Sequence, residues 1–245
     1  MSFPKVDACF KFAIHKHTKP TVNTQMKLKL LTAMALLAIL NTQKSAAQSL
    51  AKMNWFNEPE KWEIKDKNTF SFFVPAKTDY WRISHYGFTV DDAPFYYATY
   101  GGEFEVKVKI TGNYVTTFDQ MGIMLRINEN EWIKAGVEFV NGKQNVSAVV
   151  THKTSDWSVV ELAQAPASTW MKAVRKLDAV EIFYSLDDKK YTMIRTCYFK
   201  DNAPVMVGLV AACPDGKGFN ATFENFKVTP MPDQRRLDWA KKQQN

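Results

Sequence analysis

The chain has 245 residues, with 32 lysines and arginines against 25 acids and a formal net charge of +7. Such a basic excess would ordinarily indicate binding to nucleic acid or to an anionic membrane. The first 47 residues, however, hold seven of the lysines and one acid, so the remainder keeps 25 basic and 24 acidic residues. This nearly neutral remainder lacks the electrostatic signature of a nucleic-acid-binding protein, and we exclude that partner.

Residues 26–47 have the layout of a secretory signal peptide. Two lysines open the segment, residues 30–40 form an apolar run, and small residues precede a cleavage point near Ala47. The apolar run has 11 residues, which is too short to span a bilayer unaided. We therefore expect a secreted or periplasmic mature chain without an integral membrane segment. Residues 1–25 are interpreted as an upstream extension.

From residue 48 onward, short segments alternate apolar and polar residues and are separated by turn residues. A period of two is typical of strands that bury one face. Helical periodicity appears only in a short stretch, 233–244, of the C-terminal tail, 233–245. Residues 48–232 are therefore predicted to form one all-β domain, a two-sheet antiparallel jelly-roll sandwich. The predicted strands cover residues 70–74, 81–88, 95–100, 104–110, 121–127, 132–139, 145–152, 157–162, 169–176, 179–185, 191–199, 205–213 and 219–228.

Two cysteines follow the leader, Cys197 and Cys213. We expect residues 191–199 and 205–213 to pair as a hairpin, which would separate the two sulfurs by about 20 Å along the ladder. That separation is far beyond the reach of a disulfide, so both thiols are predicted to be unpaired and mostly buried. The Cys and His spacings match no metal site, and we predict no metal and no cofactor.

Six consecutive segments follow the order and spacing of a known family: TDYWR (78–82), FDQMGIMLR (118–126), WIKAGVEF (132–139), SAVVT (147–151), SDWS (155–158) and VGLVAACPDGKGF (207–219). The chain resembles domain-of-unknown-function family 1349 (DUF1349, "regulation of enolase protein 1"-like) over roughly residues 53–229. The resemblance implies a concanavalin A-like lectin or glucanase sandwich, with one convex sheet and one concave sheet that often carries a groove. It favours carbohydrate as a ligand, although a fold does not determine function.

The segment 132–139 carries the candidate site. Alternate residues of it are apolar and predicted to face the core. The opposite face presents Trp132, Lys134, Gly136 and Glu138. A hairpin loop at 127–131 brings the preceding strand alongside, with Arg126 near Trp132 and Met124 near Lys134. This face is either ordinary solvent surface or the floor of a groove, where sugar rings stack on aromatics and hydroxyls bond to charged groups.

Two further segments, predicted to lie at the ends of the sandwich, place an acid next to an aromatic residue, a combination suited to recognition loops. Asp79 and Trp81 come first, and for Trp81 both ligand binding and packing at the core edge remain open. Asp156 and Trp157 come second. There we favour a turn capped by the aspartate and a core edge closed by the tryptophan.

An enzyme is the alternative. Glycoside hydrolysis uses two carboxylates about 5–10 Å apart. The E-x-D-x-x-E string of glucanases with the implied fold does not occur here, and Glu138 finds a candidate partner only in Asp119 of the neighbouring strand.

The sequence thus predicts a lectin-like module that binds a carbohydrate or a glycan-bearing partner. Stacking is assigned to Trp132 and Trp81, and orientation of the ligand to the polar residues Arg126, Lys134, Glu138, Asp119 and Asp79. Two alternatives stay open: a glycoside hydrolase or lyase that uses Glu138 and Asp119, and a non-catalytic protein-interaction module. The oligomeric state is not predicted.

Overall fold

The structure, a computed structural model, describes residues 50–200 and 204–243. The expected upstream extension (1–25), the signal peptide (26–47) and its cleavage near Ala47 lie outside these residues. Within the described ranges, no helix combines the length and the apolar character needed to cross a membrane.

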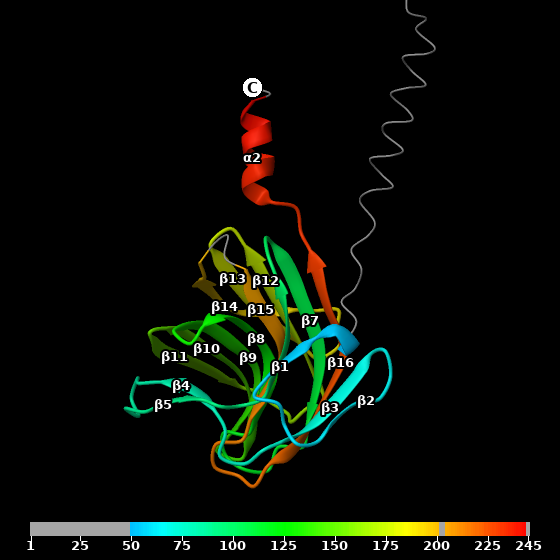
Figure 1. Ribbon diagram of the computed structural model, residues 1–245, viewed down its shortest axis with the longest axis vertical. Coiled ribbons are helices and arrows are strands. Elements are labelled where there is room, and N and C mark those ends of the chain that lie inside the picture. Colours follow the sequence, from blue (N-terminus) through cyan, green and yellow to red (C-terminus); the bar gives the residue numbers. More distant parts are fainter. Residues whose placement is uncertain (1–49, 201–203, 244–245) are drawn as a thin grey trace, which may run out of the picture. The chain divides into compact units, whose positions relative to one another are not determined.

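Two seven-stranded antiparallel sheets make up the domain (Figure 1). The first sheet has the order β1 (Asn54–Phe56), β6 (Phe95–Tyr100), β15 (Val205–Ala212), β8 (Gln120–Asn128), β9 (Glu131–Val140), β10 (Lys143–His152) and β11 (Thr154–Glu161). The second has the order β14 (Thr192–Tyr198), β13 (Ala179–Ser185), β12 (Thr169–Lys176), β7 (Phe104–Gly112), β16 (Phe219–Pro230), β3 (Thr69–Val74) and β2 (Trp62–Ile64). The predicted all-β, two-sheet sandwich is confirmed.

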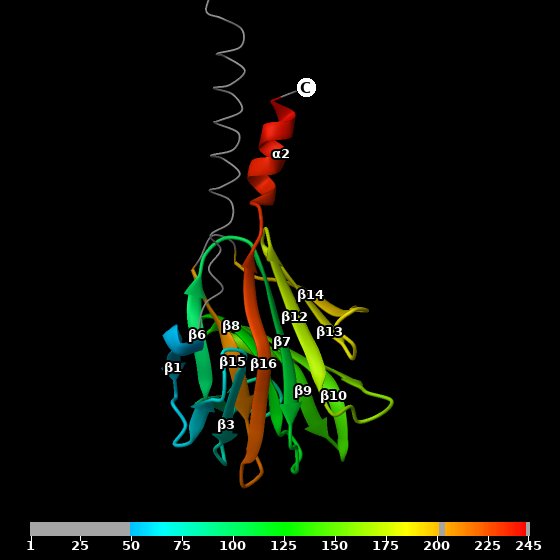
Figure 2. The same cartoon turned by 90° about the vertical axis from the view of Figure 1, so that its right-hand side faces the viewer.

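The main core lies between these sheets and contains the apolar side of each alternating strand. From β9 it takes Ile133, Ala135 and Val137, and from β7 it takes Val106 and Val108, all nearly inaccessible to solvent. Figure 2 shows β16, β7 and β12 of the second sheet side by side. The period-two pattern therefore identified the core face of these strands correctly.

The register of the central hairpins also follows the prediction. Strands β8 and β9 pair so that Arg126 lies opposite Trp132 and Met124 opposite Lys134. The next hairpin, β9–β10, turns at Asn141 and Gly142, which both have positive φ angles, 52° and 76°. Two such residues in succession are typical of the tight turn that matches the twist of a hairpin. The face opposite the core therefore presents Trp132, Lys134, Gly136 and Glu138, as expected.

One predicted strand, 81–88, is wrong. Strand β4 (Tyr80–Arg82) ends early, and β5 (Thr89–Asp91) pairs back onto it. Between them Ile83, His85 and Gly87 all have left-handed φ angles, of 63°, 62° and 76°. The backbone curls into a tight turn there, although β-branched and aromatic residues favour strands. We call residues 80–91 the β4–β5 hairpin.

The predicted hairpin of residues 191–199 with 205–213 is also wrong, because β14 pairs with β13 in the second sheet and β15 lies in the first. Both thiols are nevertheless free: Cys213 is buried and Cys197 is half-buried. Burial raises the pKa of each thiol to about 11. The prediction of unpaired cysteines is confirmed, but its reason is the assignment of the strands to different sheets.

Four short elements near the ends of the domain complete the fold. Strands β1 and β2 were not predicted, because three residues are too few to show alternation. The helix expected in the C-terminal tail is present as α2 (Gln234–Lys242), and the Asp233 side chain caps its first turn. A single 3-10 turn, η1 (Leu50–Lys52), precedes β1.

Candidate functional site

The face of the first sheet that points away from the main core carries a second apolar cluster. The β4–β5 hairpin supplies Tyr80 and Trp81, which pack with Met124, Trp132 and Val149 of the sheet. The backbone N–H of Arg82 donates to the Ser155 hydroxyl at 2.9 Å, which joins the hairpin to β11. The hairpin thus covers one half of this face and leaves the other half open.

Trp132 lies in the covered half and is only 1% exposed. Its ring meets Tyr80 edge-on, with 5.9 Å between the ring centres, and its Nε1 donates to the carbonyl oxygen of Glu129. Tyr80 is held in turn by a 2.7 Å hydrogen bond to the carbonyl oxygen of Ala93. The prediction of Trp132 as a stacking surface is wrong, because neither face of its ring is open to a ligand.

Arg126 is also part of the covered half. Its guanidinium donates two hydrogen bonds to the Asp91 carboxylate, at 2.7 and 2.6 Å, and lies 4.6 Å from the ring centre of Phe56. Burial raises the pKa of Asp91 despite the attraction of Arg126. The predicted ligand-orienting role does not fit this arrangement, because the guanidinium of Arg126 is bound to Asp91 and anchors the end of the hairpin to the sheet.

The open half forms a pocket of about 270 Å³. Its walls are aromatic: the hairpin contributes one group of rings, and β11 with the loop before β8 contributes another. Twelve residues line it: Asp79, Trp81, Tyr86, Phe88, Phe118, Gln120, Lys134, Glu138, Val149, Trp157, Pro214 and Asp215. Within the first group Trp81 contacts Tyr86, and within the second Phe118 contacts Trp157, both edge to face.

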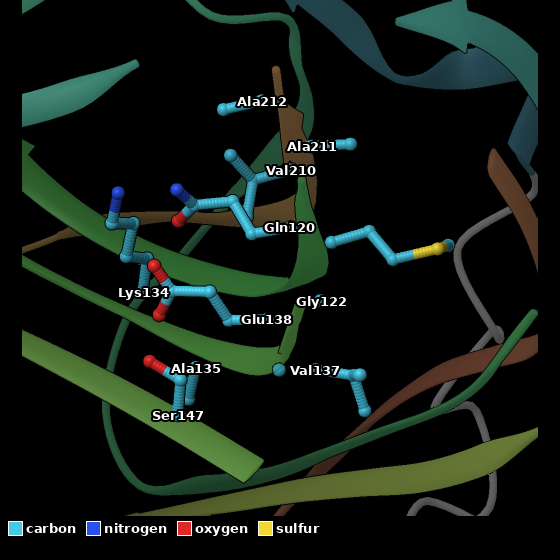
Figure 3. A pocket seen from close by; sticks show the side chains of 12 residues that line it. Gln120, Gly122, Lys134, Ala135, Val137, Glu138, Ser147, Val210, Ala211 and Ala212 are labelled. Carbon is cyan, nitrogen blue, oxygen red and sulfur yellow. The ribbon is translucent and has the colours of Figure 1, made fainter. Parts of the chain in front are cut away.

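The pocket floor is polar and internally bonded. Lys134 Nζ donates to Asp79 Oδ1 at 2.8 Å, and Gln120 Nε2 donates to the same oxygen at 3.3 Å. Glu138 Oε2 accepts a 2.9 Å hydrogen bond from Trp157 Nε1. In Figure 3 the polar ends of Gln120, Lys134 and Glu138 lie on the same side of the strands, while Val137 points the other way.

Glu138 is an acid of this floor whose pKa is raised. Burial raises its pKa above the ordinary value of 4.5, and the nearby Asp79 carboxylate adds to the effect. Lys134 and the hydrogen bonds from Ser147 and Trp157 oppose it without overcoming it. Acids with shifted pKa values cluster at functional sites, where burial and neighbouring charges are arranged to tune them.

Two facing glycines extend the floor. Gly122 and Gly136 are register partners on β8 and β9. A Cβ on Gly136 would meet the Met121 carbonyl oxygen at 1.9 Å, and a Cβ on Gly122 would meet that of Ala135 at 2.0 Å. The bare backbone leaves a hollow of about 20 Å³ bordered by Gln120, Lys134 and Glu138, about the size of one water or hydroxyl group.

Asp119 does not join this site. Its Oδ2 accepts hydrogen bonds of 2.8 Å from the backbone N–H groups of Val115 and Thr116. Gln120, the next residue, is the register partner of Glu138, and successive side chains of a strand point to opposite faces. Asp119 therefore caps a loop on the core side, and the predicted pair of Glu138 with Asp119 is not assembled.

Of the predicted residues, the structure brings Asp79, Trp81, Lys134 and Glu138 into one pocket. Sequence reasoning missed Gln120, which the alternation of β8 would have placed on the same face as Gly122. It also assigned Trp157 to a core edge, whereas this side chain lines the pocket and donates to Glu138. Tyr86 and Phe88 were hidden by the incorrect strand at 81–88.

No group of three or more His, Cys, Asp or Glu side chains is arranged to hold a metal ion within the described ranges.

Comparison with known proteins gives the family. The sequence pattern described as "Protein of unknown function (DUF1349)" matches residues 55–231. The chain belongs to this family. A relative, "Regulation of enolase protein 1" of Saccharomyces cerevisiae, is 31% identical over 186 residues, which cover 76% of this chain and 93% of that protein. The resemblance inferred from the sequence motifs is confirmed.

Solved structures support the sandwich fold of this DUF1349 protein. The crystal structure of a functionally unknown protein from Saccharomyces cerevisiae matches with a TM-score of 0.72 and 30% identity, over 76% of this chain and all of the other. The GH43 protein BlXynB from Bacillus licheniformis matches with a TM-score of 0.60 and 14% identity, over 77% of this chain and 40% of that one. At that identity the likeness to the GH43 protein shows the fold alone.

Proposed function

We propose that this DUF1349 protein binds a carbohydrate in the pocket between the β4–β5 hairpin and the first sheet. The observation that carries the proposal is the composition of the pocket, in which aromatic rings stand around a hydrogen-bonding floor. The rings come from Trp81, Tyr86, Phe88, Phe118 and Trp157. Sugars combine apolar ring faces with polar hydroxyls, and a site with aromatic walls and convergent polar groups complements both.

In this proposal the walls hold the sugar ring and the floor fixes its orientation. Lys134 Nζ supplies an N–H donor, while the carboxylates of Glu138 and Asp79 accept hydrogen bonds from hydroxyls. The pocket volume of about 270 Å³ lies just below the range of pockets that enclose a drug-sized ligand. The bound part is therefore a short unit, such as the end of a glycan chain.

The proposal includes export. The leader at residues 26–47 has the layout of a signal peptide, and a secreted or periplasmic protein would meet free or surface-bound glycans. The geometry does not favour a hydrolase that uses Glu138 and Asp119 as its carboxylate pair, because Asp119 faces away from Glu138 and accepts hydrogen bonds from backbone N–H groups.

A glycan array tests the proposal with two matched double variants. Tyr86→Ala with Phe88→Ala removes part of the aromatic wall, and since each side chain is 47% exposed the fold should be unaffected. We expect the wild-type protein to bind one class of glycan and this variant to bind it at least about tenfold more weakly.

The control is Trp62→Ala with Phe73→Ala, which removes two rings of similar exposure, 40% and 39%, on the second sheet. It should bind like the wild type. Absence of binding across neutral, acidic and amino-sugar glycans would contradict the proposal. Equal losses in the two double variants would contradict the assignment of the pocket.

A further inference from the structure

The charged groups around the pocket are mostly acidic. Among the described residues that line it, Asp79, Glu138 and Asp215 are carboxylates and Lys134 is the one cation. Lys77 lies near the rim, where its Nζ donates to the backbone carbonyl oxygen of Asp215 at 3.3 Å. The aromatic walls add the electron-rich faces of their rings, which attract cations and not anions.

The cation on the floor is already neutralised. Lys134 has a side chain only 7% exposed, and its Nζ forms a 2.8 Å ion pair with Asp79. Arg126, the register partner of Trp132 on the adjacent strand, is bound to Asp91 by two hydrogen bonds outside the pocket. An incoming carboxylate would therefore meet Glu138 without gaining an unpaired partner of opposite charge.

We propose that the pocket selects an uncharged sugar unit and rejects a uronate. This inference rests on the proposed carbohydrate binding and specifies its ligand class. A hydroxyl can donate to the carboxylate of Glu138 and accept from the ammonium of Lys134, so a neutral sugar satisfies both kinds of floor group. A uronate would lose its hydration shell and face Glu138 as a like charge, a combination that opposes binding.

The small hollow over the glycines supports the same selection. Gly122 and Gly136 open a space of about 20 Å³ between Gln120, Lys134 and Glu138. That space fits one hydroxyl group but not a planar carboxylate with its waters. A cationic amino sugar satisfies only the acceptors of the floor, because its ammonium group cannot accept a hydrogen bond from Lys134.

An array with three charge classes tests the inference on the full-length protein. It carries neutral oligosaccharides (cello-, xylo-, manno- and galacto-oligosaccharides), uronate oligosaccharides (from alginate and pectin) and chitosan oligosaccharides. We expect at least about tenfold tighter binding to the preferred neutral glycan than to any uronate.

Glu138→Gln identifies the group responsible. Glutamine keeps an oxygen that accepts from Trp157 Nε1 but removes the charge. The ratio of the affinity for neutral ligands to that for uronate ligands should therefore fall several-fold. Glu105→Gln is the control, since Glu105 lies on β7 of the second sheet, and it should leave the preference unchanged.

The outcomes separate the two proposals. Binding to uronate or chitosan oligosaccharides that equals or exceeds binding to every neutral glycan overturns the selection for uncharged sugars and leaves carbohydrate binding intact. An unchanged preference in Glu138→Gln would overturn the role of this carboxylate. A silent array overturns the proposed function, and the inference falls with it.

Discussion

One strand face of β9 has two halves that differ in what lies over them. Trp132, with Arg126 beside it on β8, is covered by Tyr80 and Asp91 of the β4–β5 hairpin. Lys134 and Glu138, on the same face, line an open pocket. Alternation in the sequence puts all of these residues on one face, but a separate hairpin decides which of them line the pocket. The covered half therefore contributes stability, and the open half is available for binding.

The largest loss of stability is expected from a substitution in the covered half. Trp132→Ala should lower the free energy of unfolding by about 3–5 kcal/mol, because it removes a buried indole and leaves Tyr80 without its edge contact. Urea denaturation followed by circular dichroism measures the change. A loss below about 1 kcal/mol would mean that the ring is not a core element, and would contradict the assignment of Trp132 to a covered, stabilising half of the face.

A slightly smaller loss is expected from Asp91→Ala, because it leaves the guanidinium of Arg126 buried without its partner. The free energy of unfolding should fall by about 3 kcal/mol. Glu161→Ala is the control: it breaks an exposed ion pair with Lys143 and should change stability by no more than about 0.5 kcal/mol. Equal effects in the two variants would show that Arg126 does not depend on the hairpin.

Gly136→Ala tests the close approach of β8 and β9 under the open half. The new methyl group would lie 1.9 Å from the Met121 carbonyl oxygen, so the strands must shift, at a cost of about 1–3 kcal/mol. Gly101→Ala adds a methyl where no atom lies within 4 Å and should preserve the melting temperature. If both variants have the same melting temperature, the two strands tolerate a side chain at this point.

The smallest effect is a pH dependence from the open half. Because burial raises the pKa of Glu138, its contribution to stability is full below its ordinary value of 4.5 and is lost as pH rises through the folded-state value. Glutamine does not titrate, so the stability of Glu138→Gln relative to wild type should increase as pH is raised from 4 toward neutrality. Thermal melts across that range measure it, and a difference that stays flat would show that Glu138 is solvated.

The sequence predicted the strand faces well, because a period of two reports directly on burial. It placed Lys134, Gly136 and Glu138 on the face opposite Ile133, and it paired Arg126 with Trp132 correctly. If the alternation of β8 is extended back by one residue, Asp119 falls on the core side with Ile123. Its exclusion from the site could therefore have been predicted.

The sequence pattern could not show that a distant segment, the β4–β5 hairpin, covers part of this face. The left-handed conformation of Ile83 opposes the usual preference of a β-branched residue for strands, so the sequence pattern concealed the turn that makes the β4–β5 hairpin. The burial of Trp132 depends on that turn. Tryptophan is common both in cores and at binding sites, and only the position of Tyr80 over its ring separates the two cases.

The most direct test of the proposed binding site is a crystal structure of the protein with the neutral oligosaccharide that the array identifies. We predict a sugar ring between the Trp81 and Trp157 sides of the pocket, with hydroxyls bonded to Glu138 and Lys134 and with Trp132 still covered by Tyr80. A sugar bound elsewhere, for instance over Trp62 and Phe73 on the second sheet, would contradict it. So would a sugar that reaches Trp132 by displacing the hairpin.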